Sequence, residues 1–381
     1  MFFSAKKHCV VVTCFDESQP GFLDFSYRIA ALAKVYQLTI ISQFRITQAE
    51  LEFVNVDYQV FKIKNGKLGW FSYVLKCAKF IRKHKPAVLV LLHSAAAPIA
   101  LLTGSTPVCL YWNEHPSNLV RSPTSFAPFS YAMAVILQRI VFIAAKKADL
   151  VMPIGEAHLV DLHKNGIQPS NTKMLYMGVS KDFIPTDDIH LGNCSQVLRL
   201  IYTGTVSKAR GRDVMLEAMA LLDKENIDVH LTIIGCSDDQ LKFCTQRVNE
   251  LGIEKSVELL GRIPGKNIPD YLAQADLGIC LWERSPWTEF NPPTKLFEYL
   301  VAGLPILASN ISSHTRYVDN WKNGLIFEYD ANSLAEIIIN LNLQKSKIIG
   351  LKERAKDSGK QYLWEKLEPI FLKEVHQLVV A

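Results

Sequence analysis

The chain has 381 residues, a length that favours two domains over one. Hydrophobic residues make up 49%, charged residues 21% and aromatic residues 10%, which excludes a disordered, a collagen-like or a disulfide-framework protein. The net charge of +5 is unevenly distributed, because residues 1–195 carry 20 Lys and Arg against 13 Asp and Glu, whereas residues 196–381 are net acidic.

In the first half, short β-rich segments alternate with helical patterns. The expected strands are 8–15, 38–43, 87–93, 107–112, 150–154 and 173–176. The expected helices are 24–35, 70–84, 95–103, 126–147 and 155–164. Several strands are apolar throughout, as in a sheet whose two faces are both covered. The alternation predicts a parallel sheet with crossover helices, and hence an α/β fold.

A polar stretch rich in Pro, Gly and Asp at 178–197 breaks this pattern, which then resumes at Leu198. The expected strands of the second half are 198–205, 229–235, 257–260, 276–281, 305–308 and 324–328. The expected helices are 212–223, 238–251, 266–274, 293–302 and 331–341, followed by a last helix at 361–381. The second half therefore repeats the α/β alternation of the first.

We expect two doubly wound α/β domains. The first spans residues 1–182 and is completed by the C-terminal helix 361–381. Residues 183–197 form the linker, and residues 198–360 form the second domain. Because open α/β sheets bind ligands at the carboxyl ends of their strands, two such domains in tandem predict a ligand cleft between them.

The eight cysteines and the apolar segments indicate a cytoplasmic protein. The cysteines form no CxxC pair and lie mostly in apolar runs, as reduced core residues do. The apolar start of the chain ends at Asp16 and Glu17, so it reads as a first strand and not as a secretory signal. The apolar runs 87–102 and 130–145 are interrupted by polar residues and fall short of the roughly 20 apolar residues of a spanning helix.

A glycine-flanked loop opens the second domain. Gly204 ends the first strand, the loop TVSKAR follows, and Gly211 precedes a helix. Free backbone N–H groups and the positive end of the helix dipole would face an anion there, and Lys208 and Arg210 add charge. The loop is therefore either a phosphate site or an ordinary turn with basic residues at the surface.

The segment WTEFNPPTKLFEYLVAGLPILA at 287–308 carries a second signal. Its prolines fit a loop or a first helical turn, the helix continues to Val301, and Gly303 caps it. Glu298 lies in the middle of this helix among apolar residues. Its carboxylate is either solvated on the polar face or turned toward the hydroxyl pair of a ligand.

Together these segments resemble family 4 of the retaining glycosyltransferases, the bacterial-type group 1 enzymes with the GT-B fold of two Rossmann-like domains facing a cleft. The resemblance covers nearly the whole chain. It is carried by GVSKDFIP, IYTGTVSKARG, LTIIG, LLGRIP and PPTKLFEYLVAGLPIL, in that order and spacing. It implies that a sugar is transferred, with retention of anomeric configuration, from a UDP- or GDP-linked donor to an acceptor hydroxyl.

The resemblance assigns roles in donor binding. Glu298 matches the second Glu of the family motif and would accept hydrogen bonds from the ribose hydroxyls. The first Glu of that motif falls on Phe290, so either Glu289 replaces it or backbone N–H groups from Asn291 to Thr294 contact the donor. Arg210 matches the basic residue of the diphosphate loop. Backbone around Arg262 and Ile263 would hold the base. The implied donor-binding set is Gly21, Thr205, Lys208, Arg210, Arg262, Ile263, Glu289, Asn291, Thr294, Lys295 and Glu298.

Catalysis is assigned to both halves of the chain. The segment YWNEHP follows a strand, and His115 lies where relatives carry a His beside the reacting sugar. We expect His115, Arg210 and Glu298 to be catalytic, with an imidazole that only caps its loop as the alternative for His115. His93 is expected to be a satisfied core histidine. The sequence contains no Asp-x-Asp and no His/Cys cluster, so we expect neither a metal nor a cofactor.

The segment 62–85 is strongly basic. It holds eight Lys and Arg, and no Asp or Glu occurs between Asp57 and Glu114. On a helical wheel one face carries Ser72, Lys76, Lys79 and Lys83, and the opposite face carries Trp70, Val74, Cys77, Ala78 and Ile81. The basic face is either solvated or in peripheral contact with an anionic membrane, with Trp70, Phe71, Tyr73 or Phe80 inserting. We expect no nucleic-acid partner.

The resemblance thus implies a cytoplasmic, metal-independent retaining glycosyltransferase, held peripherally at the inner face of the cytoplasmic membrane if its acceptor is lipid-linked. Its acceptor would be a glycan or a lipid-linked glycan of cell-surface lipopolysaccharide, capsule or exopolysaccharide biosynthesis. Two alternatives stay open. One is a sugar-nucleotide 2-epimerase of the same fold. The other is a sugar-nucleotide-binding protein without turnover, suggested by Phe290 in place of the first Glu.

Overall fold

The structure is a computed structural model that describes residues 6–14, 21–44, 56–62, 66–120, 128–185 and 197–380. The chain forms two compact units. Unit 1 comprises Met1–Met177 and Lys366–Ala381, and unit 2 comprises Gly178–Glu365. Most of the predicted linker, residues 186–196, lies outside the described residues.

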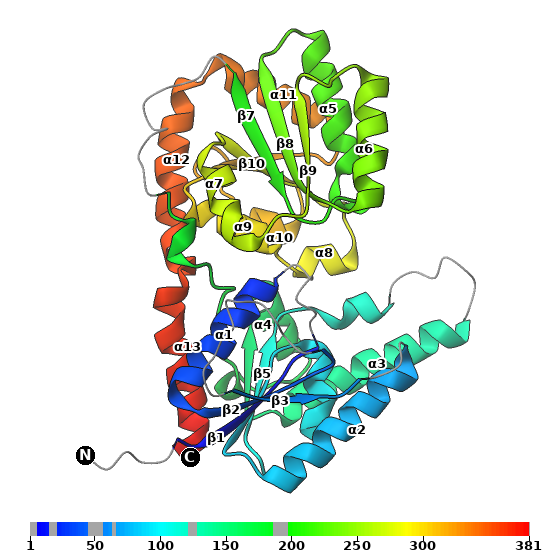
Figure 1. Cartoon of the computed structure of the whole chain (residues 1–381), viewed down its shortest axis with the longest axis vertical. Helices are drawn as coiled ribbons and strands as arrows, with labels where there is room; N and C mark the ends of the chain where they lie inside the picture. The colour runs from blue at the N-terminus through cyan, green and yellow to red at the C-terminus, as the bar shows by residue number, and fades with distance from the viewer. Residues whose placement is uncertain are drawn as a thin grey trace. The chain divides into compact units, whose positions relative to one another are not determined.

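Unit 1 is built on a parallel six-stranded sheet with helices packed around it (Figure 1). Its strands are β1 (His8–Val12), β2 (Gln37–Ser42), β3 (Val56–Val60), β4 (Val88–Leu91), β5 (Val108–Trp112) and β6 (Leu150–Pro153). Its helices are α1 (Phe22–Val35), α2 (Lys67–His84), η2 (Ser94–Leu102), η3 (Pro116–Val120), α3 (Pro128–Lys147), α4 (Glu156–Lys164) and η4 (Pro169–Asn171). The strand order β3-β2-β1-β4-β5-β6 is that of a doubly wound fold.

Three elements of unit 1 differ from the prediction. The edge strand β3 was not predicted, although Asp57 and Gln59 alternate with apolar residues along its five residues as in a half-buried strand. The predicted strand 173–176 is not a strand of the described structure, although Lys173 and Leu175 donate backbone hydrogen bonds to Val151 and Pro153 of β6. The predicted helix 95–103 is the 3-10 helix η2, which contains Pro98, a residue that cannot donate an α-helical hydrogen bond.

Unit 2 repeats this architecture. Its strands are β7 (Leu198–Thr203), β8 (Val229–Cys236), β9 (Val257–Gly261), β10 (Leu277–Cys280), β11 (Ile306–Ser309) and β12 (Gly324–Phe327). They form a parallel sheet in the order β12-β11-β10-β7-β8-β9, the same winding as in unit 1. The predicted fold class, two doubly wound α/β domains, is therefore confirmed.

The helices of unit 2 connect these strands. They are η5 (Lys181–Phe183), η6 (Lys208–Arg210), α5 (Arg212–Lys224), α6 (Asp238–Leu251), η7 (Gly265–Asn267), α7 (Ile268–Ala273), α8 (Pro286–Phe290), α9 (Thr294–Val301), α10 (Ser312–Thr315), α11 (Ala331–Leu343), α12 (Ser346–Gly359) and η8 (Lys360–Tyr362). The last helix, α13 (Trp364–Val380), begins in unit 2, and its residues from Lys366 onward belong to unit 1. Within the described ranges, the helices lack the combination of length and apolar character needed to cross a bilayer.

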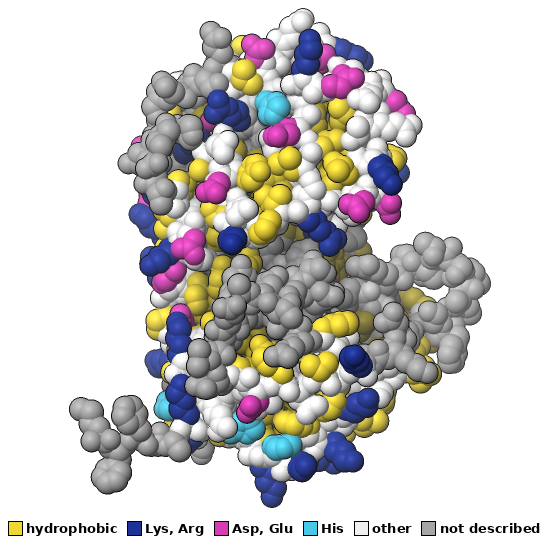
Figure 2. Space-filling model, in the orientation of Figure 1, with side chains coloured by type: hydrophobic (Ala, Val, Ile, Leu, Met, Phe, Trp, Pro, Cys, Tyr) yellow, Lys and Arg dark blue, Asp and Glu magenta, His cyan; other side chains and the backbone are white. Residues whose placement is uncertain are grey.

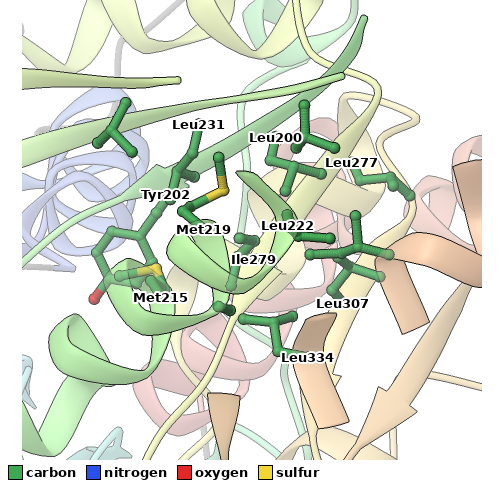
Figure 3. Packing of buried hydrophobic residues seen from close by; sticks show 14 of the residues in the cluster. Leu200, Tyr202, Met215, Met219, Leu222, Leu231, Leu277, Ile279, Leu307 and Leu334 are labelled. Carbon is green, nitrogen blue, oxygen red and sulfur yellow. The ribbon is translucent and has the colours of Figure 1, made fainter. Parts of the chain in front are cut away.

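The core of unit 2 fixes α5 to the sheet. Figure 3 shows Leu200, Leu231 and Leu277 of the central strands with Met215 and Met219 of α5 in one buried cluster. Burying apolar side chains of this kind is the main source of folding free energy. The packing sets the position of the N-terminus of α5 relative to the carboxyl end of β7, where the loop of interest lies.

The cysteines of the described residues are all free of disulfide bonds. Cys9, Cys77 and Cys109 are buried in unit 1, and Cys236, Cys244 and Cys280 are buried in unit 2. Their burial agrees with the prediction of reduced core residues.

Candidate functional site

The carboxyl end of β7 leads into a glycine-flanked loop and then into α5. Gly204 follows the strand with a φ of +108°, and Gly211 precedes the helix with a φ of +76°. Both angles lie in the region that favours glycine. A Cβ added at Gly211 would lie 2.2 Å from Leu281 Cδ1, so the loop packs directly against the chain after β10. The loop therefore places its backbone at the carboxyl edge of the sheet, beside the N-terminus of α5.

Hydrogen bonds hold the backbone of this loop while its predicted side chains stay at the surface. The hydroxyl of Tyr202 donates to the carbonyl of Thr205 over 2.7 Å, and the hydroxyl of Tyr329 donates to the carbonyl of Lys208 over 2.9 Å. The side chains of Thr205 and Lys208 are exposed. Both side chains are accessible to an anion on a loop of fixed shape.

Arg210 lies against two tryptophans. Its guanidinium carbon is 4.7 Å from the centroid of the Trp282 ring and 6.0 Å from that of Trp287. The two indoles stack on each other with centroids 5.2 Å apart. Stacking on aromatic faces orients a guanidinium and suits it to bind a phosphate with two N–H groups. Arg210 is half-buried, so its charge is screened less than that of Lys208.

Lys295 is a buried lysine at the second position of α9. Its side chain is 5% exposed, and its Nζ lies 3.3 Å from the centroid of the Tyr202 ring. Among the described residues, Nζ has no hydrogen-bond partner. Burial, with a smaller contribution from the charge of Arg210, lowers the pKa of this amine to about 7, while Cys280 and Glu298 oppose the shift. A Cβ added at Gly204 would lie 3.6 Å from Nζ, so the amine lies beside the glycine loop.

Glu298 lies one helical turn beyond Lys295 on α9. Burial raises the pKa of its carboxyl group to about 7, and the charge of Lys295 partly opposes this shift. The side chain is half-buried, whereas a carboxylate on a fully solvated face would keep its ordinary pKa. This burial distinguishes Glu298 from a fully solvated carboxylate, and its predicted contact with the hydroxyl pair of a ligand stays a prediction.

The residues from the end of α8 to the start of α9 make hydrogen bonds within unit 2. Glu289 accepts a hydrogen bond of 2.8 Å from the backbone N–H of Ser312. Asn291 is buried and donates from Nδ2 to the carbonyl of Trp287 over 2.7 Å. Thr294 is the half-buried first residue of α9. Donor contacts by these side chains stay predictions, and the Glu289 carboxylate has a structural partner.

Arg262 and Ile263 follow β9 at the same edge of the sheet as the glycine loop. Arg262 is exposed and Ile263 is half-buried. Because β7, β8 and β9 are parallel neighbours, their carboxyl ends open on one side of unit 2. This position suits the predicted role of the backbone here in holding a base, which stays a prediction.

Gly21 belongs to unit 1 and precedes α1 with a φ of +88°. Residues 15–20 of the predicted flexible loop lie outside the described residues. The start of α1 is tied to the core, because Tyr111 donates to Asp24 Oδ2 over 2.6 Å and the buried Arg28 pairs with Asp24. Gly21 therefore directly precedes a helix whose first turn is hydrogen-bonded to the core of unit 1.

His115 is buried in unit 1 with both ring nitrogens engaged. Its Nδ1 accepts a hydrogen bond of 3.2 Å from the backbone N–H of Ser117, and its Nε2 lies 3.1 Å from Asp161 Oδ2. The ring stacks nearly parallel to that of His158 and lies edge-on to Phe142. This arrangement is that of the loop-capping alternative. The catalytic role of His115 stays a prediction.

His93, Asn113 and Glu114 link the ends of β4 and β5. His93 Nδ1 accepts from the backbone N–H of Ala95 over 2.9 Å, and its Nε2 lies 3.1 Å from Glu114 Oε2. The side-chain oxygen of Asn113 accepts from the N–H of Ser94 over 3.3 Å. The ring of His93 is buried and hydrogen-bonded, as predicted for a core histidine.

Trp282, Trp287 and His314 form an aromatic floor beside Arg210 that was not predicted from the sequence. Trp282 is 3% exposed, and its indole Nε1 has no hydrogen-bond partner among the described residues. His314 packs on Trp282 with ring centroids 5.7 Å apart, and burial lowers its pKa to about 3. The position of Trp282, just beyond the apolar strand β10, was a signal that could have located it.

The described basic side chains beside the glycine loop include the exposed Lys208, the half-buried Arg210 and the buried Lys295. In the part of the chain that the structure describes, no group of three or more His, Cys, Asp and Glu side chains is placed to hold a metal ion.

Comparison with known proteins places this geometry in a family. The family model of glycosyl transferases group 1 matches residues 192–361, the part of the chain that carries the glycine loop and α9. The amylovoran biosynthesis glycosyltransferase AmsK of Erwinia amylovora is 25% identical over 206 residues, which cover 53% of this chain and 49% of that protein. The spore coat protein SA of Bacillus subtilis is 28% identical over 133 residues, 33% of this chain and 34% of that protein. The chain thus spans a third to a half of the length of these curated relatives.

Solved structures match over nearly the whole chain. Alr3699/HepE of Anabaena, solved with UDP and glucose, superposes with a TM-score of 0.75 at 17% identity, covering 97% of this chain and 99% of that one. WaaG, a glycosyltransferase involved in lipopolysaccharide biosynthesis, superposes with a TM-score of 0.71 at 17% identity, covering 95% and 99%. At this identity the likeness is one of fold. Residues 192–361 are therefore a glycosyl transferases group 1 domain, in a chain with the GT-B fold.

Proposed function

We propose that this chain is a retaining glycosyltransferase that takes its sugar from a nucleotide-diphosphate donor. The observation that carries the proposal is the pairing of Arg210 and the buried Lys295 at the glycine loop of a group 1 domain. An arginine and a lysine beside a loop that leads into the N-terminus of α5 suit a diphosphate better than a neutral ligand. The structures of HepE with UDP and with UDP-glucose support a nucleotide sugar as the ligand class.

The proposed chemistry follows from where charge develops. Breaking the bond between the sugar and the phosphate leaves a growing negative charge on the departing diphosphate, and preorganised cations at that position lower the barrier. Arg210 is oriented by its tryptophans, and Lys295 is held by burial, so neither has to be rearranged in the transition state. Glu298 would accept hydrogen bonds from the ribose hydroxyls and so fix the donor in position.

We place the acceptor among cell-surface glycans. AmsK is named for amylovoran biosynthesis, and WaaG is described as involved in lipopolysaccharide biosynthesis. A polysaccharide or lipid-linked acceptor is therefore the class to test first. A cytoplasmic location with peripheral membrane contact is part of this proposal, and the surface of α2 supports it.

The buried side of α2 corrects part of the sequence interpretation. Tyr73, expected as a candidate for membrane insertion, is fully buried and donates to the carbonyl of Thr13 over 2.9 Å. Trp70 is half-buried and donates to the carbonyl of Ala95, and Phe80 packs against the core of unit 1. Of the four aromatic residues proposed to insert, Phe71 alone is exposed, at 52%.

The exposed side of α2 combines apolar and basic side chains. Leu68 is 90% exposed, and Leu75 is 55% exposed. At 100° per residue these two leucines and Phe71 form one stripe that is bordered by a basic stripe. We define the α2 surface as Leu68, Phe71, Leu75, Lys76, Lys79 and Lys83. Figure 2 shows Lys and Arg side chains gathered along this helix. An apolar stripe beside lysines suits the surface of an anionic bilayer.

The proposal is tested by ligand screening followed by product analysis. A thermal-shift screen of UDP-, GDP- and ADP-sugars identifies the donor, since a bound ligand raises apparent stability by mass action. The donor is then incubated with and without lipid-linked glycan acceptors. Transfer to an acceptor with retained configuration supports the proposal. A changed sugar nucleotide without acceptor would indicate an epimerase, binding without turnover would indicate a binding protein, and no binding would overturn the proposal.

A further inference from the structure

We propose that Lys295 binds the diphosphate of the donor directly and takes up a proton from solvent as it does so. The inference rests on the proposed function and deepens it. It makes donor affinity depend on pH through one named amine. The reaction at Lys295 is the addition of one proton to a neutral amine, which gives an ammonium ion paired with the phosphate charge.

The burial of Lys295 favours a ligand that supplies a hydrogen-bond partner for its amine. A lysine amine that is 5% exposed and has no hydrogen-bond partner among the described residues is costly to keep in a folded chain. The ring of Tyr202 offers its face to the amine and compensates part of this cost. Nζ also lies beside the backbone of Gly204, the first residue of the anion loop. A phosphate oxygen at that loop would supply the missing partner.

The groups that face Lys295 leave it without a fixed counter-charge. Tyr202 faces it from β7, Arg210 from η6, Cys280 from β10, His314 from α10 and Glu298 from its own helix. Burial raises the pKa of Cys280 to about 12 and that of Tyr202 beyond this, and it lowers that of His314 to about 3. These three are therefore neutral near pH 7. Arg210 adds a constant positive charge, and Glu298 titrates near pH 7 itself.

The sign of the linkage follows from these charges. Without a donor, burial and Arg210 hold the pKa of Lys295 near 7, so the amine loses its proton as pH rises through that value. A bound diphosphate stabilises the ammonium form and raises the pKa. Donor affinity should be highest below pH 7 and fall above it, by at most about tenfold per pH unit, the limit for one linked proton.

The test measures protons taken up on binding to the full chain. UDP-glucose, GDP-mannose and ADP-glucose are titrated by calorimetry in buffers of different ionisation enthalpy, at about pH 6 and about pH 8. Nucleotide sugars are used because the terminal phosphate of a free nucleotide titrates at about pH 6 and would add its own protons to the count. At the higher pH, wild type should take up close to one proton more than Lys295→Met, and this difference should vanish at the lower pH.

Three variants make the result specific. Lys295→Arg keeps a permanent charge, so it should bind the nucleotide sugar at the higher pH without taking up the extra proton. This variant still tests the inference if Lys295→Met fails to fold. Lys208→Met removes an exposed lysine from the same loop and should keep the wild-type proton count even where its affinity falls. Repeating the comparison in Glu298→Gln removes the opposing proton release from that carboxyl.

The outcomes separate this inference from the proposed function. Equal proton counts and equal pH slopes in wild type and Lys295→Met would overturn the role of Lys295 while leaving the proposed function intact. No binding of any of the three nucleotide sugars to wild type at the lower pH would overturn the proposed function, and this inference with it.

Discussion

Glu289 Oε2 accepts a hydrogen bond of 2.8 Å from the backbone N–H of Ser312, at the N-terminus of α10. The other carboxylate oxygen lies 3.3 Å from Arg284 Nε. The carboxylate therefore joins α8 to α10, the helix that carries His314 of the aromatic floor. A negative charge at a helix N-terminus is stabilising.

Glu289→Gln is expected to affect stability more than donor binding. Weakening a charge-assisted contact to a helix N-terminus should lower the free energy of unfolding by about 1 kcal/mol. Donor affinity should change less than in Glu298→Ala, because both oxygens of Glu289 have partners within unit 2. Urea unfolding and calorimetric titration measure the two quantities. An affinity loss as large as that of Glu298→Ala would instead restore the predicted donor role of Glu289.

Arg210→Ala and Glu298→Ala are each expected to weaken binding of the nucleotide sugar. Loss of a hydrogen bond to a charged group costs about 1.5–3 kcal/mol, which corresponds to roughly 10- to 100-fold in affinity. Arg247→Ala, on the outer side of α6, is the matched control and should bind as wild type does. Calorimetric titration with the nucleotide sugar measures the affinity of all three variants and of the wild type. Unchanged affinity in both variants would remove the proposed site.

Lys295 and Glu298 are expected to have opposite effects on stability as pH changes. Burial lowers the pKa of Lys295 from 10.5 to about 7, so the folded chain is penalised for the ammonium form below pH 7. Burial raises the pKa of Glu298 from 4.5 to about 7, so the penalty for its carboxylate is largest above pH 7. Lys295→Met should therefore stabilise the chain most at acidic pH, and Glu298→Gln most at alkaline pH, each by on the order of 1–3 kcal/mol. Urea unfolding across this range measures both, and gains that do not depend on pH would contradict the assignment.

The winding of both sheets could be predicted from the sequence because their central strands are apolar runs separated by helical patterns. The edge strand β3 was not predicted because it is a run of only five residues, although apolar and polar residues alternate along it as in a half-buried strand. Tyr73 was expected to be exposed because an aromatic residue occurs on both the apolar and the polar face of amphipathic helices. In the structure its hydroxyl is buried and donates to the carbonyl of Thr13, 60 residues away in the sequence. Long-range hydrogen bonds of this kind leave no local pattern.

For the candidate site, as for the fold, the sequence predicts the segments with a local pattern but not the contacts between distant segments. The glycine loop and α9 carry local signals, so Arg210, Lys295 and Glu298 could be proposed as site residues from the sequence, and their roles stay predictions. Trp282 was not found, because it contacts Arg210 only through folding of segments more than seventy residues apart. The engagement of Glu289 by Ser312 was hidden for the same reason. Local sequence patterns thus predict which charged residues belong to the candidate site. The hydrogen-bond and ring partners of those residues depend on tertiary packing.

His115→Ala is expected to lower turnover more than donor affinity. The ring also fastens its loop through Ser117 and Asp161, so the variant should lose about 1–2 kcal/mol of stability as well. Asp161→Asn keeps the imidazole but weakens its anchor, and it should share the stability loss without the full loss of turnover. Measuring kcat, donor affinity and unfolding for both variants separates the two roles. Wild-type kcat in folded His115→Ala would leave His115 as a loop cap.

The α2 surface is expected to bind anionic vesicles in a salt-dependent manner. Each lysine near such a bilayer contributes on the order of 1 kcal/mol, so replacing Lys76, Lys79 and Lys83 with Gln should release the chain from phosphatidylglycerol vesicles at low salt. The exposed lysines Lys242, Lys255 and Lys266 of unit 2, replaced in the same way, give a control with the same loss of charge. Leu68→Ser with Leu75→Ser should weaken the binding that persists as salt rises, because apolar insertion is not screened. Co-sedimentation at increasing salt measures all three, and equal release by the two lysine triplets would show that net charge, and not this helix, is responsible.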